Sequence, residues 1–365
     1  MIPVLKGRRL AITTDAVGGI WRYAMDVAAG FAARGVKVTL IGLGPAPGPG
    51  KQQEAAAAGV HLDWLDDRLD WTVADAAAAT ALAQDLGRRV AAVEADLLHL
   101  NAPALLGAAN FPAETVVAAH SCLASWWRAV RRTALPPEWE WHKRLSARGL
   151  RRASVAIVPS AAFAADLGAL HGPLPSLRVV PNAARPGPVR RKAPEVLAAG
   201  RWWDEGKNLS ALDAAAAGID WPVLAAGSAC GPSGETVRAE HLRLVGALDA
   251  AEMAEHYGRA SIFISLSLYE PFGLAVLEAA SAGAALVLSD IPTFREIWEG
   301  AALFVDPARP EEAARAVNSL IADPGFRLRL GRNAQLRAGR YSLRRQLEGL
   351  DAAYRDALSL RRLSA

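Results

Sequence analysis

Residues 261–283, SIFISLSLYEPFGLAVLEAASAG, hold the pattern that decides the fold. An apolar, β-branched run from Ser261 to Leu266 is followed by a short loop containing Pro271, and then by an apolar segment that ends near Gly283. A buried parallel strand, a loop at its carboxyl end and a helix packed on the sheet produce this pattern. The stretch therefore predicts one strand–loop–helix unit of an α/β sheet.

The same alternation extends along the chain in both directions. The predicted strands of the first half are 10–13, 37–41, 60–65, 97–100, 115–119, 154–158 and 177–180, and those of the second half are 195–199, 222–226, 242–245, 261–266, 285–288 and 302–305. Alanine-rich segments with helical periodicity fill most of the gaps, for example 20–34, which is followed by Gly35. This alternation predicts the α/β class, with doubly wound parallel sheets.

A break in the pattern divides the chain into two predicted domains. Residues 182–194 are rich in Pro and Arg and have no apolar period, as expected of a linker. The length of 365 residues also fits two domains. We expect domains at 1–185 and 186–344, followed by a C-terminal segment with a helical pattern. Ligands of such sheets bind at the carboxyl ends of the strands, so a cleft between the domains is expected.

Composition excludes several classes of protein. Lys and Arg number 41 against 37 Asp and Glu, and the net charge of +4 lacks the electrostatic footprint of a dedicated nucleic-acid binder. The two cysteines, Cys122 and Cys230, have no metal-ligand spacing and predict neither a zinc site nor a disulfide framework. No apolar run is long enough to span a bilayer. These features predict a cytoplasmic protein.

The segment YEPFGLAVLE carries two carboxylates in a row that faces the expected cleft. Glu270 falls in the loop, and Glu278 falls about two turns along the helix. The backbone N–H groups of Phe272, Gly273 and Leu274 lie at the helix start, where they favour an anion. Carboxylates accept hydrogen bonds from vicinal hydroxyls, so the row suits a sugar at one end and a ribose at the other, with phosphates between.

A second loop, GRWWDEGKN, places Arg201 and Lys207 six positions apart between a strand and a helix. Together an arginine and a lysine suit a pyrophosphate. The alternative is a solvated cluster in which both cations pair with Asp204 and Glu205, and the charge pattern alone favours that alternative.

A third loop, DAVGGI, follows the first predicted strand. Gly18 and Gly19 allow close backbone approach before a long helix, whose N-terminus favours an anion. Tight loop geometry is an equal explanation. The loop is not GxGxxG, which counts against a dinucleotide-binding oxidoreductase.

With these three motifs in this order, nearly the whole chain resembles the family-four retaining glycosyltransferases, which have the GT-B fold of two Rossmann-like domains facing across a cleft. The resemblance implies an acceptor-side domain at 1–185 and a donor-binding domain at 186–344, with a C-terminal helix at about 345–365 that packs back on the first domain. It also implies transfer of a hexose from a nucleoside diphosphate sugar to an acceptor hydroxyl, on a sugar, a lipid-linked group or a small aglycone, with no other cofactor.

The resemblance also assigns site residues. It implies that Arg201 and Lys207 hold the diphosphate, and that Gly18 and Gly19 close over the phosphates. It assigns Glu270 to the transferred sugar and Glu278 to the ribose. The nucleobase is expected near Val245, within 244–247. His120, at the end of the strand TVVAA, occupies the place of a family histidine that faces the transferred sugar. Without the resemblance, a lone histidine there is more often structural. No Asp-x-Asp pair occurs in the chain, so metal-independent transfer is expected.

Residues 126–152 contain four tryptophans among many arginines and lysines, with only two acidic residues. Three interpretations remain open: helix packing with solvated arginines, contact with the acceptor, and weak association with the inner face of a membrane. Two rival functions remain open as well. One is a sugar-nucleotide epimerase or hydrolase on the same architecture, and the other is a non-catalytic sugar-binding protein.

Overall fold

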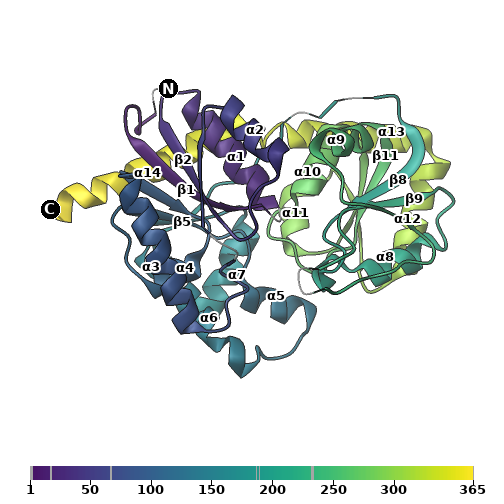
Figure 1. Cartoon of the computed structure of the whole chain (residues 1–365). Helices are drawn as coiled ribbons and strands as arrows, with labels where there is room; N and C mark the ends of the chain where they lie inside the picture. Colours follow the sequence, from purple (N-terminus) through teal and green to yellow (C-terminus); the bar gives the residue numbers. More distant parts are fainter. Residues whose placement is uncertain are drawn as a thin grey trace. The chain divides into compact units, whose positions relative to one another are not determined.

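The computed structural model describes residues 3–16, 19–65, 68–185, 187–188, 190–231 and 234–364. Chain contacts divide it into two compact units. The first unit is Met1–Arg128 with Thr133–Asn182 and Leu343–Ala365, and the second is Ala183–Ser342 with Ala129–Arg132. Figure 1 follows the chain by colour through both units.

The first unit contains a seven-stranded sheet in the order β3-β2-β1-β4-β5-β6-β7, with every pair parallel. Its strands are β1 (Arg9–Asp15), β2 (Lys37–Leu43), β3 (His61–Trp64), β4 (Leu97–Leu100), β5 (Glu114–Ala118), β6 (Val155–Val158) and β7 (Leu177–Val179). The connecting helices are α1 (Gly19–Ala32), α2 (Pro49–Ala57), α3 (Ala76–Ala92), α4 (Pro103–Ala108), α5 (Leu123–Val130), η1 (Pro137–Trp139), α6 (Glu140–Arg152) and α7 (Ala161–His171). The strand order reverses between β1 and β4, and such a switch point is where open α/β sheets bind ligands.

The C-terminal helix α14 (Leu343–Ser364) belongs to the first unit (Figure 1). It packs with α1 on one face of the sheet, where Leu350 and Tyr354 are fully buried beside Leu10 and Ile12 of β1. The apolar face of this helix therefore completes the core of a unit formed mainly by the first half of the chain.

The second unit contains a six-stranded parallel sheet in the order β10-β9-β8-β11-β12-β13. Its strands are β8 (Ala193–Ala199), β9 (Val223–Ala226), β10 (Arg243–Gly246), β11 (Ala260–Ser265), β12 (Ala285–Ser289) and β13 (Leu303–Val305). Its helices are η2 (Glu205–Lys207), α8 (Leu209–Ala216), α9 (Ala250–Arg259), α10 (Leu274–Ser281), α11 (Pro292–Trp298), α12 (Pro310–Ala322) and α13 (Pro324–Ala338).

Alternate residues of the central strands enter two separate cores. Val196 of β8 and Ile262 of β11 lie in one core with α8 and α12, whereas Leu197 and Phe263 lie in the other with α9, α10 and α11. Burial on both faces explains why these strands are continuous apolar runs in the sequence. The predicted α/β class with two parallel sheets is confirmed.

Candidate active site

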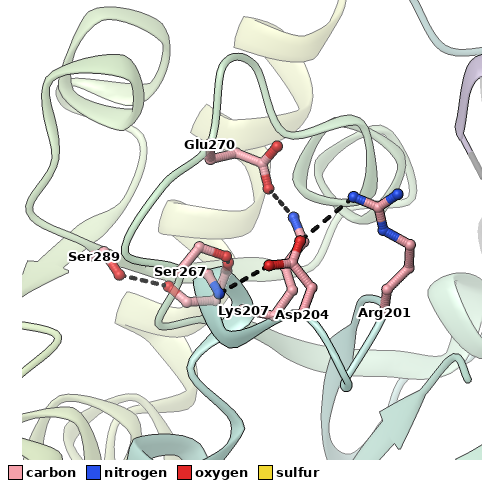
Figure 2. A network of polar contacts seen from close by, with 8 residues as sticks. Arg201, Asp204, Lys207, Ser267, Glu270 and Ser289 are labelled. Carbon is pink, nitrogen blue, oxygen red and sulfur yellow. Dashed lines mark hydrogen bonds and ion pairs between the residues drawn. The ribbon is translucent and has the colours of Figure 1, made fainter. Parts of the chain in front are cut away.

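The cationic loop that follows β8 meets the carboxylate loop that follows β11. Lys207, the last residue of η2, places its Nζ 2.6 Å from Oε2 of Glu270, and the two side chains are 18% and 17% exposed. Figure 2 shows this pair together with Arg201 and Asp204. Parallel strands end at the same edge of a sheet, so loops distant in sequence meet there.

Arg201 is held more loosely than Lys207. Its Nη2 lies 3.4 Å from Oδ2 of Asp204, its side chain is 47% exposed, and its guanidinium lies 5.3 Å from the ring centre of Trp203. The solvated-cluster interpretation is therefore right for the Arg201–Asp204 pair and wrong for Lys207, whose carboxylate partner is Glu270.

Asn208 fixes the position of Lys207, and the sequence motifs did not predict this role. Its backbone is left-handed, with φ 56°. Its Nδ2 donates to the backbone oxygens of Leu266 and Pro307, each at 3.0 Å. Asparagine tolerates this conformation better than most residues, so an Asn directly after the lysine was the available signal.

The start of α10 depends on Gly273. Its φ of +90° is a conformation that side chains rarely adopt, and a Cβ here would lie 2.9 Å from the ring of Phe294. The neighbouring Phe272 is buried against Tyr341, and Leu274 is the first residue of the helix. The turn thus brings a helix N-terminus, which favours anions, next to Glu270.

Glu278 lies on α10 and is hydrogen-bonded to the hydroxyl of Tyr257 on α9. Burial, with the nearby Glu278 carboxylate as a further cause, raises the pKa of Tyr257 well above its usual value, so the phenol stays a donor. This hydrogen bond orients the carboxylate of Glu278, for which the sequence predicted no partner.

The expected nucleobase position, Val245, lies on β10 and is partly buried. The loop before β10 is anchored by Asp213, whose carboxylate accepts the backbone N–H groups of Glu240, His241 and Leu242 at 2.9–3.1 Å. These backbone hydrogen bonds hold the pKa of Asp213 below its usual value against the opposing effect of burial.

In the first unit, His120 lies two residues after the end of β5 and is partly buried. Its Nε2 lies 2.8 Å from Oδ1 of Asn101, and its ring packs edge-on against Tyr23 with centres 4.4 Å apart. Burial lowers the pKa of His120 to about 4, so the imidazole is neutral at pH 7. Gly19 is the exposed first residue of α1, whereas Gly18 lies outside the described residues.

The tryptophan-rich segment 126–152 forms part of α5, then η1 and α6. Gly149 of α6 approaches α4 so closely that a Cβ there would lie 1.9 Å from the oxygen of Pro103. Trp141 is buried and stacks on Trp139, and Arg151 donates to the backbone oxygen of His171. Helix packing thus accounts for Trp141 and Arg151.

The described residues contain neither a membrane-spanning helix nor a cluster of metal ligands. Within the ranges given above, no helix combines the length and the apolar character of a membrane crossing. Nor do three or more His, Cys, Asp or Glu side chains gather there as metal ligands would.

Comparison with known proteins identifies the family. Residues 17–186 match the family described as "Glycosyltransferase Family 4", and residues 203–337 match "Glycosyl transferases group 1". One relative is D-inositol 3-phosphate glycosyltransferase of Acidothermus cellulolyticus, 35% identical over 115 residues, which are 31% of this chain and 25% of that relative. The matched stretch thus spans about a quarter of the length of such curated relatives.

Solved structures match over nearly the whole chain. Sucrose-phosphate synthase from Thermosynechococcus elongatus has a TM-score of 0.80 at 19% identity, covering 97% of this chain and 100% of that one. The Anabaena protein HepE in complex with UDP-glucose has a TM-score of 0.72 at 16% identity, covering 97% and 99%. The chain belongs to the family-four glycosyltransferases, and its fold is GT-B.

Proposed function

We propose that this protein transfers a hexose from a nucleoside diphosphate sugar to an acceptor hydroxyl, without a metal ion and with retention of configuration. The observation that carries the proposal is the Lys207–Glu270 pair, 2.6 Å apart, beside the start of α10. One cation, one carboxylate and a helix N-terminus gather there at the carboxyl edge of a parallel sheet. That set of groups suits a phosphate attached to a polyhydroxylated ring.

The donor diphosphate contacts Lys207, Arg201 and the backbone N–H groups of residues 272–274. Arg201 is about half exposed, and its ion pair with Asp204 is long at 3.4 Å, so its guanidinium can turn toward a phosphate. Arginine binds phosphate bidentately, and lysine adds a point charge. Both cations then stabilise the charge that develops on the leaving nucleoside diphosphate.

The remaining contacts follow the order of the carboxylates along the chain. Glu270 bonds hydroxyls of the transferred sugar, Glu278 bonds the ribose, and Val245 lies beside the nucleobase. His120 faces the transferred sugar from the first unit. The acceptor attacks from the face that the leaving group departs from, and the leaving phosphate accepts the acceptor's proton, so none of these side chains acts as a nucleophile.

The HepE complexes with UDP and with UDP-glucose support a nucleotide-sugar donor for a chain of this fold. They do not separate transfer from the rival functions, which are epimerisation or hydrolysis of a sugar nucleotide and binding without turnover. The product formed with an added acceptor separates all three.

The test has two stages. A thermal-shift screen with UDP-glucose, GDP-mannose and other nucleoside diphosphate hexoses identifies the donor, because a ligand that binds only the folded state raises Tm. The protein is then incubated with the donor that the screen identifies and with sugar, lipid-linked or small-molecule acceptors, both with and without excess chelator. We expect a glycoside with the anomeric configuration of the donor, formed equally in chelator. An epimerised donor, free sugar alone, an inverted product or loss of transfer on chelation would each overturn the corresponding part of the proposal.

A further inference from the structure

A polar network within the first unit connects His120 to the C-terminal helix. Nε2 of His120 lies 2.8 Å from Oδ1 of Asn101, and Nε2 of His99 lies 3.2 Å from the same oxygen. Nδ1 of His99 lies 2.8 Å from the hydroxyl of Tyr354 on α14. His99 and Tyr354 are fully buried. The network therefore links three segments that are distant in sequence, and the residues at its centre have no contact with solvent.

Thr13 of β1 fixes the orientation of the Asn101 amide. Nδ2 of Asn101 donates to the backbone oxygen of Thr13 at 2.5 Å, and the backbone N–H of Asn101 donates to Oγ1 of Thr13 at 2.8 Å. A carbonyl oxygen only accepts, so the amide nitrogen of Asn101 must face Thr13 and its Oδ1 must face the two histidines. Nε2 of His120 therefore donates to Oδ1 of Asn101. Nε2 of His99 lies 3.2 Å from this oxygen and also 3.2 Å from the hydroxyl of Tyr23.

Burial keeps both imidazoles neutral. It lowers the pKa of His99 to about 3, with the nearby His120 as a further cause, and that of His120 to about 4. A neutral imidazole carries one N–H. Since Nε2 of His120 carries it, Nδ1 of that ring is an unprotonated acceptor. Tyr23 packs edge-on against this ring, and burial raises the pKa of its hydroxyl, so no charged group among these contacts alters the assignment.

We propose that Asn101 is a positioning residue that holds His120 in its Nε2–H tautomer, so that Nδ1 accepts a hydrogen bond from a hydroxyl of the transferred sugar. This inference rests on the proposed function for the role of the sugar, but the tautomer and its control by Asn101 are properties of the first unit alone. A merely structural Asn101 would stabilise the unit without affecting the ring protons of His120.

The first experiment observes the ring directly. Long-range ¹H–¹⁵N correlation spectra of histidine-labelled protein distinguish protonated from unprotonated ring nitrogens, and the His120→Gln spectrum assigns the His120 signals. At pH 7.5 we expect a protonated Nε2 and an unprotonated Nδ1 in the wild type. In Asn101→Asp, a carboxylate beside Nε2 favours the imidazolium, so the ring pKa should rise by about one to three units.

The second experiment measures transfer. Asn101→Asp should acquire an acidic limb in the pH profile of kcat that follows its new His120 pKa, because the imidazolium has no acceptor nitrogen, and raising the pH should restore activity. Asn101→Ala should lower kcat about tenfold with affinity for the free nucleoside diphosphate unchanged, the effect of losing one hydrogen bond. Asn318→Ala is the matched control, since Nδ2 of Asn318 also donates to a backbone oxygen, that of Gly218, in the second unit.

Tyr354→Phe separates positioning from general damage to the network. It removes the hydroxyl bonded to His99 while leaving Asn101 and His120 in place, so it should lower Tm without changing the His120 tautomer. A protonated Nδ1 of His120 in the wild type would overturn the proposal. So would His120 signals and a kcat that neither Asn101 variant changes. An equal loss of kcat per folded molecule in Tyr354→Phe and Asn101→Ala would overturn it as well. If the wild type transfers no sugar, the proposed function fails, and the spectra alone decide whether Asn101 controls the tautomer.

Discussion

Nζ of Lys207 and Oε2 of Glu270 lie 2.6 Å apart although 63 positions separate the two residues in the chain. Each side chain is less than a fifth exposed, so the pair is partly shielded from the solvent that weakens surface ion pairs. Replacing either residue would remove the ligand contact proposed for it and leave the other side chain without this charge partner.

Arg201→Ala and Lys207→Ala should each lower the rate of transfer. A charge-assisted hydrogen bond is worth about 1.5–3 kcal/mol, which corresponds to roughly one to two decades in rate. Arg309→Ala is a matched control, because Arg309 is an exposed, ion-paired arginine of the same unit. Steady-state kinetics at matched folding checks the result, and unchanged donor turnover in both variants would remove the diphosphate assignment.

The two glutamates should separate in their effects. Glu270→Ala is expected to reduce turnover more than nucleotide affinity, because Glu270 is assigned to the sugar. Glu278→Ala is expected to weaken binding of the free nucleoside diphosphate, because Glu278 is assigned to the ribose. Calorimetric titration measures the affinities, with exposed Glu255→Ala on α9 as the control. A larger affinity loss for the Glu270 variant would reverse the two roles.

His120→Ala should lower transfer strongly while affinity for the free nucleoside diphosphate stays nearly unchanged, because that ligand lacks the sugar. No covalent glycosyl-enzyme should accumulate, and mass spectrometry of the quenched reaction checks this. Turnover per folded molecule and Tm are measured on the same variant. A destabilised protein with normal turnover per folded molecule would assign His120 to packing.

The first unit should lose stability in mild acid because of His99. Its pKa is about 3 in the folded state, against 6.5 for an unperturbed histidine. The unfolded state binds the proton more readily, so the stabilisation is complete above pH 6.5 and is lost as pH falls toward the folded pKa. Between pH 6.5 and 5.5 we expect a loss of about 1 kcal/mol from this residue. Denaturant unfolding at both pH values measures it, and an equal pH dependence in His99→Gln would contradict the assignment.

Gly149→Ala should destabilise the first unit by about 1–3 kcal/mol, because the added methyl group overpacks the α4–α6 contact. Its Cβ would lie 1.9 Å from the backbone oxygen of Pro103. Gly168→Ala on α7 is the control, since a Cβ there meets nothing within 4 Å. That substitution should be neutral or stabilising by about 0.4–1 kcal/mol. Thermal unfolding compares them, and equal Tm values would show that the helices can separate at small cost.

The sequence by itself determined the class of fold and the position of most elements. The apolar run predicted at 97–100 is β4, and that predicted at 285–288 is β12 with one further residue. The sequence pattern of a capping box, Asp249 three residues before Glu252, forms one at the start of α9, where each side chain accepts from the other residue's backbone N–H. Both features have a signature within a short stretch of sequence: a strand buried on both faces is a continuous apolar run, and a helix cap is formed by residues three positions apart.

Only the tertiary structure decided which polar groups meet. Charge pattern favoured partners for Lys207 within its own loop, whereas the sheet order brings β8 beside β11 and thereby supplies Glu270. The contact between His99 and Tyr354 spans 255 positions and depends on α14 completing the first unit. Hydrophobic periodicity records how deeply a residue is buried, but hydrogen-bond partners depend on which strand ends and helices the fold places side by side, and no local pattern carries that information.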